Sequence, residues 1–157
     1  MKTPEPRDTY ELIGHKQNER FILKAWEKDK IPHALLLSGP KGVGKATFAF
    51  RVARFLLNNG GIDQNSQNGL DFGQQIIDET LAVPRENIVS RQVVNNAHPN
   101  LLVIQRSENS QTKKIRSEIV IEDLKSLKSF LNLKASDGRW RVVIIDTIDD
   151  MNPNSAN

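Results

Sequence analysis

The sequence predicts an α/β fold in which helices pack against a parallel β-sheet. Short, continuously apolar runs stand at 33–38, 101–104 and 142–145, and strands of this kind are typically buried on both faces of a parallel sheet. Amphipathic helical patterns separate the runs, and a glycine-rich turn follows the first of them. The 157 residues amount to about one domain.

Composition excludes several kinds of site. The chain contains no cysteine, so disulfides, thiolate zinc sites and cysteine nucleophiles are ruled out. Its 22 basic and 19 acidic side chains give a net charge of +3, which permits contact with nucleic acid but does not predict it. No apolar run has the length of a membrane span or of a signal peptide. We therefore expect a cytoplasmic protein that does not contact a membrane.

The first elements are an arm, a helix and a strand. Residues 1–9 are polar, include two prolines, and are expected to form a flexible arm. Apolar residues at helical spacing predict one amphipathic helix from Tyr10 to Lys28. Pro32 separates this helix from the next element. The apolar run His33–Ser38 then predicts a buried strand that leads into the glycine-rich turn.

A second helix is predicted after this turn, at Ala46–Leu57. Its apolar stripe is expected to face the core, while Arg51 and Arg54 face water. Residues 58–75 are rich in Asn, Gln and Gly, which indicates a loop or an insertion. The later elements are helices around Ile76–Leu81 and Ile88–Ala97, a strand at Leu101–Ile104, a helix at Ile121–Leu131, a strand at Val142–Ile145, and a helix that opens at Asn152.

The glycine-rich turn between the first strand and the second helix has the pattern of a phosphate-binding P-loop. Glycines let the backbone bend so that several N–H groups face one anion, and the helix N-terminus behind them also attracts phosphate. Lys45 would contact the outer phosphates as a point charge. The candidate nucleotide-binding residues of this segment are Gly39, Pro40, Lys41, Gly42, Val43, Gly44, Lys45, Ala46 and Thr47.

Two positions depart from the pattern of an active ATPase. The residue after the P-loop lysine normally carries the hydroxyl that ligates magnesium, but here it is Ala46. Thr47 lies about 100° further round the helix and is a poor substitute. Asp146 ends the last strand like a Walker B aspartate, but Thr147 follows it where an oligomeric ATPase has a water-orienting glutamate. We therefore predict no catalytic residues, and a site that binds phosphate without hydrolysing it.

Five segments together resemble the delta-prime subunits of bacterial DNA polymerase III clamp loaders, which are AAA+ proteins. Their order and spacing carry the resemblance, because each one alone is unspecific. They are Leu12–His15, Ile31–Ala34, Ala97–Leu102, Arg139–Asp146 and Met151–Asn157.

The resemblance implies a three-layer αβα fold with a P-loop and a parallel sheet. It also implies a place in a five-subunit ring with the delta and motor subunits, which opens the sliding clamp and loads it on primed DNA. A degenerate nucleotide site is typical of this family, so ATP or ADP is expected to bind weakly or not at all, and magnesium only with a nucleotide. Ile13 would line the adenine pocket. The family's zinc module is not expected here because its cysteines are missing.

The resemblance further implies that the chain is an N-terminal part of such a domain. In AAA+ domains the strand order is 5-1-4-3-2, and strand four, the lid and the collar domains have no counterpart within residues 1–157. The unpaired backbone groups that this leaves are costly when buried. Two alternative functions remain open, namely the active motor ATPase of the same machine and an unrelated P-loop ATP-binding protein.

Other residues carry weaker signals. His33 and His98 are expected to be buried or capping residues, because neither has a second ligand at metal spacing, and no metal site is predicted. Trp26 and Trp140 are expected in or near the core. Lys113, Lys114 and Arg116 could contact DNA phosphates, but a solvated loop is the more ordinary interpretation, since no aromatic residues are interleaved with them.

Overall fold

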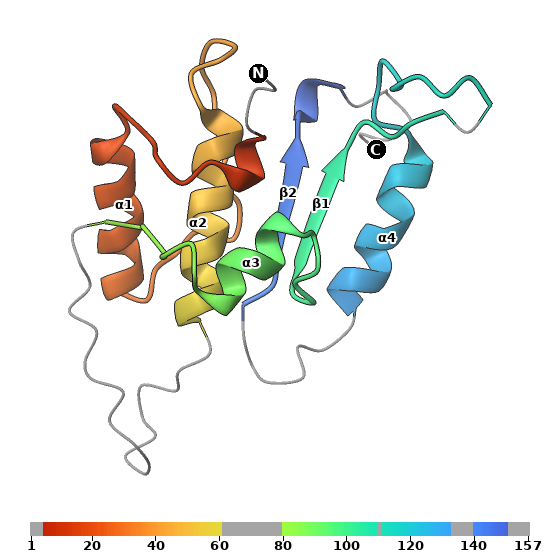
Figure 1. The fold of residues 1–157 in the computed structure, drawn as a ribbon. Helices are drawn as coiled ribbons and strands as arrows, with labels where there is room; N and C mark the ends of the chain where they lie inside the picture. The colour runs from red at the N-terminus through yellow and green to blue at the C-terminus, as the bar shows by residue number, and fades with distance from the viewer. Residues whose placement is uncertain (1–4, 61–79, 110, 133–139, 151–157) are drawn as a thin grey trace.

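A computed structural model of the chain describes residues 5–60, 80–109, 111–132 and 140–150. Within these ranges the chain forms an α/β fold whose two strands are parallel (Figure 1). The elements in chain order are the short 3-10 helix η1 (Pro6–Asp8), α1 (Lys16–Glu27), α2 (Lys45–Asn59), α3 (Ile88–Val94), β1 (Leu101–Gln105), α4 (Ile121–Asn132), β2 (Val142–Asp146) and the 3-10 helix η2 (Ile148–Asp150).

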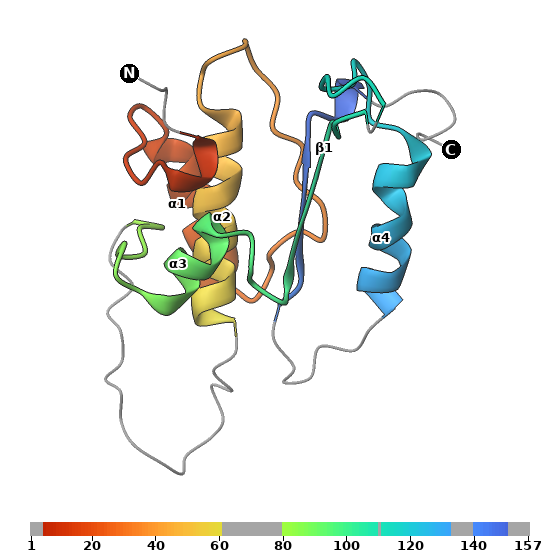
Figure 2. The same cartoon turned by 45° about the vertical axis from the view of Figure 1, so that its right-hand side comes forward.

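The sheet confirms the two later strands. Leu101 pairs with Val142, and the register continues to Gln105 opposite Asp146. Parallel neighbours require a crossover connection, which usually contains a helix, and the predicted helix α4 lies in this connection. Helices α1, α2 and α3 lie on one side of the sheet and α4 on the other (Figure 2).

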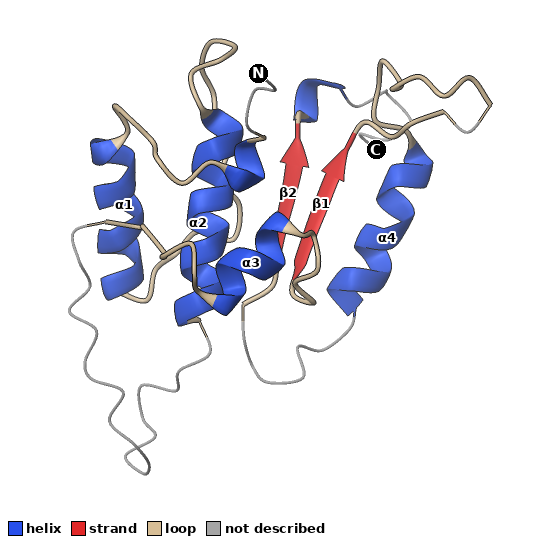
Figure 3. Cartoon of the chain, in the orientation of Figure 1, coloured by secondary structure: helices blue, strands red, loops and turns tan. Residues whose placement is uncertain are grey.

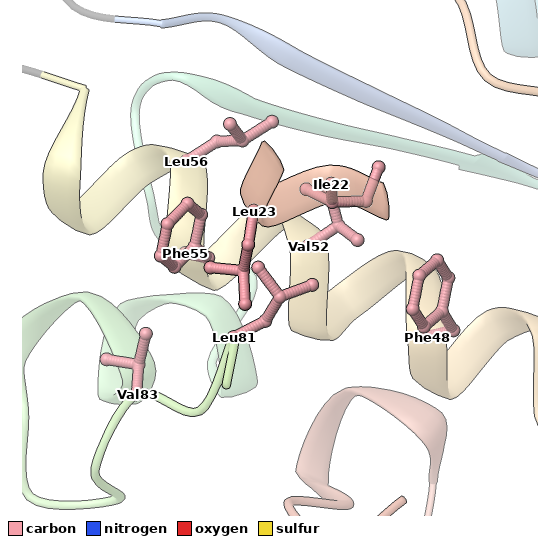
Figure 4. Close-up of a cluster of buried hydrophobic side chains, with 8 residues drawn as sticks. All are labelled: Ile22, Leu23, Phe48, Val52, Phe55, Leu56, Leu81 and Val83. Carbon is pink, nitrogen blue, oxygen red and sulfur yellow. The ribbon is translucent and has the colours of Figure 1, made fainter. Parts of the chain in front are cut away.

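Helix α2 is central to the packing because both clusters of buried apolar side chains include it. The first cluster joins it to α1 and to the extended residues Leu81 and Val83 (Figure 4). The second joins it to α3, β1 and β2 through Phe50, Ala53 and Leu57. Trp26 and Trp140 are half-buried beside the first cluster, with ring centroids 6.2 Å apart. The prediction that both tryptophans lie in or near the core is confirmed.

The predicted strand at His33–Ser38 is wrong. This segment is a loop between α1 and α2 (Figure 3), and Leu36 is 78% exposed. A strand is stable only when a neighbour takes up its backbone hydrogen bonds. Among the described residues β1 and β2 pair with each other and no strand pairs with 33–38. The apolar run has the side chains of a buried strand but lacks the partner that would make it one.

The N-terminal predictions also need correction. The described part of the arm, from Glu5 to Thr9, includes η1 and lies against α2 and α3. The first helix begins at Lys16 rather than near Tyr10, because Gly14 adopts φ +86°, which a right-handed helix does not allow. The two arginines of α2 do not face water as predicted. Arg54 is 1% exposed and donates to the carbonyls of Arg7 and Thr9 in the arm. Arg51 is half-buried and paired with Glu19.

The remaining differences concern element ends. Helix α2 continues through Asn58 and Asn59, so these residues belong to the helix and not to the predicted loop. Residues 61–79 lie outside the described part, and they include the first four residues of the helix expected around Ile76–Leu81. Its last two residues, Thr80 and Leu81, are described and are not helical. The helix expected to open at Asn152 also lies outside it.

Candidate phosphate-binding site

The glycine-rich loop stands directly before α2, at the end of the molecule where β1 and β2 also end (Figure 1). Gly39, Gly42 and Gly44 have φ values of +144°, +85° and +93°. Residues with a Cβ rarely adopt these conformations. The three glycines therefore give the loop the bends on which the predicted phosphate cradle depends.

Lys45 occupies this loop. Its Nζ donates to the carbonyl of Gly39 at 2.8 Å and to that of Pro40 at 2.9 Å. These bonds hold one positive charge against the mouth of the loop, with only neutral acceptors as partners. An anionic phosphate oxygen is a stronger acceptor than a carbonyl, so a bound phosphate could replace them.

The structure also places Ala46 and Thr147, the two residues that depart from the pattern of an active ATPase. Ala46 and Thr47 lie in the first turn of α2, and both are half-buried. Asp146 is the last residue of β2 and is paired with Gln105, and Thr147 follows it. The glycine-rich loop and the end of β2, where Asp146 stands, are therefore at the same end of the fold (Figure 1).

The remaining predicted residues of the site are mostly on the surface. Val43 is 43% exposed and Lys41 is also exposed. Ile13, the predicted adenine contact, is 91% exposed. A side chain this open is available to a ligand.

Sequence reasoning singled out Leu12–His15 through the resemblance but did not predict that it lies against this loop. His15 Nε2 is 2.8 Å from the carbonyl oxygen of Val43. A Cβ placed on Gly44 would be 3.1 Å from Leu12 Cδ1. No spacing rule could have found these contacts, since His15 and Val43 are 28 residues apart.

Two arginines of α2 hydrogen-bond the backbone just before Leu12–His15. Arg51 pairs with Glu19 at 2.6 Å and donates to the carbonyl of Tyr10 at 2.6 Å. Arg54 donates to the carbonyls of Arg7 and Thr9, both at 3.0 Å. Burial lowers the pKa of the Arg54 guanidinium, and the nearby Tyr10 opposes this shift. Their spacing of three residues was the one available signal that they share a face of the helix.

The histidines and the other basic residues have ordinary surroundings. His98 is buried and its Nδ1 accepts a hydrogen bond from the backbone N–H of Asn100 at 3.1 Å, which confirms a capping role. His33 is exposed, against expectation, since the strand that would bury it does not form. Within the described ranges no three His, Asp or Glu residues are grouped as a metal site. Lys113 and Lys114 are exposed on the loop after β1.

Comparison with known proteins identifies the family. A family model described as DNA polymerase III, delta subunit, matches residues 14–157, which is most of the chain. The chain belongs to this family. As a member of the DNA polymerase III delta subunit family it is a clamp-loader-type subunit in DNA replication. No curated protein and no solved structure matches it. None of the helices in the described part of this family member is long and apolar enough to cross a bilayer.

Proposed function

We propose that the chain acts as a delta-prime subunit, the stator of the clamp loader, with a nucleotide site that does not hydrolyse ATP. The observation that carries the proposal is the combination of a bent glycine-rich loop before α2 with Ala46 and Thr147 at the positions where hydrolysis needs a hydroxyl and a carboxylate. Each missing group would otherwise stabilise the transition state by several kcal/mol. A motor subunit has no reason to lack both.

The chain's own residues fit a diphosphate better than a metal. The backbone N–H groups of the loop and Lys45 would hold the phosphates, and Ile13 is exposed and free to cover a base. Asp146 would be the one carboxylate near a magnesium ion. We expect ATP or ADP to bind weakly, with magnesium only as its companion, and no zinc. The fold in this proposal is the P-loop αβα fold of AAA+ proteins.

The proposed partners are the delta and motor subunits, with the sliding clamp and primed DNA reached through the assembly. The proposal also includes one further strand, which would lie between β2 and 33–38. Leu35 and Leu36 are 40% and 78% exposed in that segment. A strand at this place would take up the backbone hydrogen bonds of 33–38, and each leucine side chain that the completed sheet buries would contribute about 2 kcal/mol.

The test is reconstitution of the full chain with delta and motor subunits from the same organism. We expect the chain to enter a complex that loads the clamp, and Lys45→Ala in this chain to leave the ATPase rate of the complex within about twofold. Incorporation together with a tenfold loss of ATP turnover would instead identify a motor subunit. Failure to enter the complex would contradict the proposed role.

A further inference from the structure

The segment Tyr10–His15, here called the strap, is held at its first residue. Arg51 donates to the Tyr10 carbonyl, and the Tyr10 ring lies 4.7 Å from the guanidinium of Arg54 on one side and of Arg85 on another. Because Arg51 is itself paired with Glu19, the strap is tied to α1 and α2 together. Its starting position is therefore fixed relative to the helix that follows the glycine-rich loop.

The other end of the strap touches the loop. Leu12 and His15 are the side chains nearest to Gly44, at 3.1 Å and 3.6 Å from the place where a Cβ would be. The His15 ring also lies 6.0 Å from that of Phe48, one turn into α2. The strap thus runs from Arg51 and Arg54 of α2 to the glycine-rich loop, where His15 hydrogen-bonds the carbonyl of Val43.

The bond between His15 and Val43 fixes a direction as well as a distance. A carbonyl can only accept, so Nε2 of His15 carries the proton that is shared with Val43 O at 2.8 Å. Nδ1 is then free to accept from Asn18 Nδ2, which lies 3.4 Å away. Helix α1 therefore selects the tautomer that the loop requires.

The peptide between Val43 and Gly44 links this bond to the phosphate cradle. In a planar trans peptide the C=O and the following N–H point in opposite directions. Holding the Val43 carbonyl toward the strap therefore holds the Gly44 N–H away from it, as one of the loop's potential anion donors. We propose that His15 is a positioning residue that sets the orientation of this peptide, and through it the affinity of the loop for phosphate.

This inference rests on the proposed function only where it concerns phosphate, so its first test needs no ligand. Long-range ¹H–¹⁵N spectra of the full chain should show His15 protonated at Nε2 and unprotonated at Nδ1 near neutral pH. In His15→Ala we expect the Val43 carbonyl ¹³C and Gly44 amide ¹⁵N resonances to shift, because the carbonyl of this peptide loses its hydrogen bond to His15. His15→Gln, whose amide can still donate, should restore both resonances. His33→Ala is the matched control, because His33 is an exposed histidine outside the strap.

The second test is titration with ADP, using a fluorescent analogue. We expect His15→Ala to weaken binding about tenfold, while His15→Gln and His33→Ala stay within threefold of the unsubstituted chain. A His15 protonated at Nδ1, or unchanged Val43 carbonyl and Gly44 amide resonances in His15→Ala, would overturn the inference. So would unchanged ADP affinity in that variant. If the unsubstituted chain binds no ADP, the nucleotide site of the proposed function fails, while the spectra still decide whether His15 orients the loop.

Discussion

Two apolar regions of the chain, the cluster around α2 and the run 33–38, differ in how far their side chains are buried. On the helical side, α1, α2 and residues 81–83 enclose a cluster in which Leu56 is 5% exposed. On the sheet side, Leu36 belongs to an equally apolar run and is 78% exposed. Sequence pattern alone does not separate these leucines. What separates them is whether a partner for the backbone and the side chain is present in the described residues.

Truncating both leucines tests this difference in burial with the largest expected effect. Leu56→Ala should lower the free energy of unfolding by about 3 kcal/mol, because it leaves a cavity in a closed cluster. Leu36→Ala should change it by less than about 0.5 kcal/mol, because the side chain is already in water. Urea unfolding followed by circular dichroism measures both. Similar losses in the two variants would show that 33–38 is buried in solution.

The next largest effect is expected at the buried arginine. Arg54→Met should cost about 2 kcal/mol, because the carbonyls of Arg7 and Thr9 lose their donors in a buried place. The control is Arg85→Met, which removes an exposed guanidinium from the other contact of Tyr10 and should cost less than about 1 kcal/mol. Equal effects would contradict the role assigned to burial.

The same arginine makes a prediction about pH. Because burial lowers its pKa in the folded state, the unfolded chain holds this proton to higher pH, and stability rises with pH only in the alkaline range between the two pKa values. Near neutral pH the guanidinium is charged in both states. The stability difference between Arg54→Met and the unsubstituted chain should therefore be constant from about pH 6 to pH 8.

An effect of similar size is expected at Gly60, which lies against Trp140. A Cβ on Gly60 would overlap the Trp140 ring, whereas one on Gly42 would meet nothing within 4 Å. Gly60→Ala should cost about 2 kcal/mol by overpacking, and Gly42→Ala about 1 kcal/mol through its positive φ alone. Thermal unfolding of the two variants checks the order. A larger loss in Gly42→Ala would place Trp140 elsewhere.

Amide hydrogen exchange tests the difference between the paired strands and the run 33–38 without any substitution. Amide hydrogens of β1 and β2 that form the ladder should exchange slowly, whereas those of residues 34–38 should exchange at nearly the rate of an unstructured peptide. Slow exchange in all three segments of a monomer would contradict both the loop at 33–38 and the proposed additional strand.

Much of the fold was predictable because local pattern and tertiary partner agree. The apolar runs at β1 and β2 and the helical stripes of α2 and α4 were recognised, and each has its neighbour in the chain. The failures have one cause each. The run at 33–38 lacks a strand partner, and Arg54 is buried by carbonyls of the arm, which no periodicity reveals.

The bend of the glycine-rich loop was predictable from the sequence, its contacts with other segments were not, and phosphate binding stays a prediction. The glycine spacing indicated the loop, and the positive φ values of Gly39, Gly42 and Gly44 agree with it. The contacts of the strap were not predicted, because they join residues that are distant in the chain and belong to no recognisable motif. A hydrogen bond from a histidine to a distant backbone carbonyl has no sequence pattern from which it could be predicted.

We propose that this loop binds nucleotide phosphates, although Ala46 and Thr147 replace the hydroxyl and the carboxylate that hydrolysis needs. The most direct measurement titrates the full chain with ADP and then follows phosphate release from ATP with magnesium over an hour. We expect saturable ADP binding that Lys45→Ala abolishes, and no release above the uncatalysed rate. Magnesium-dependent turnover of about 1 per second, ordinary for an enzyme, would contradict the account.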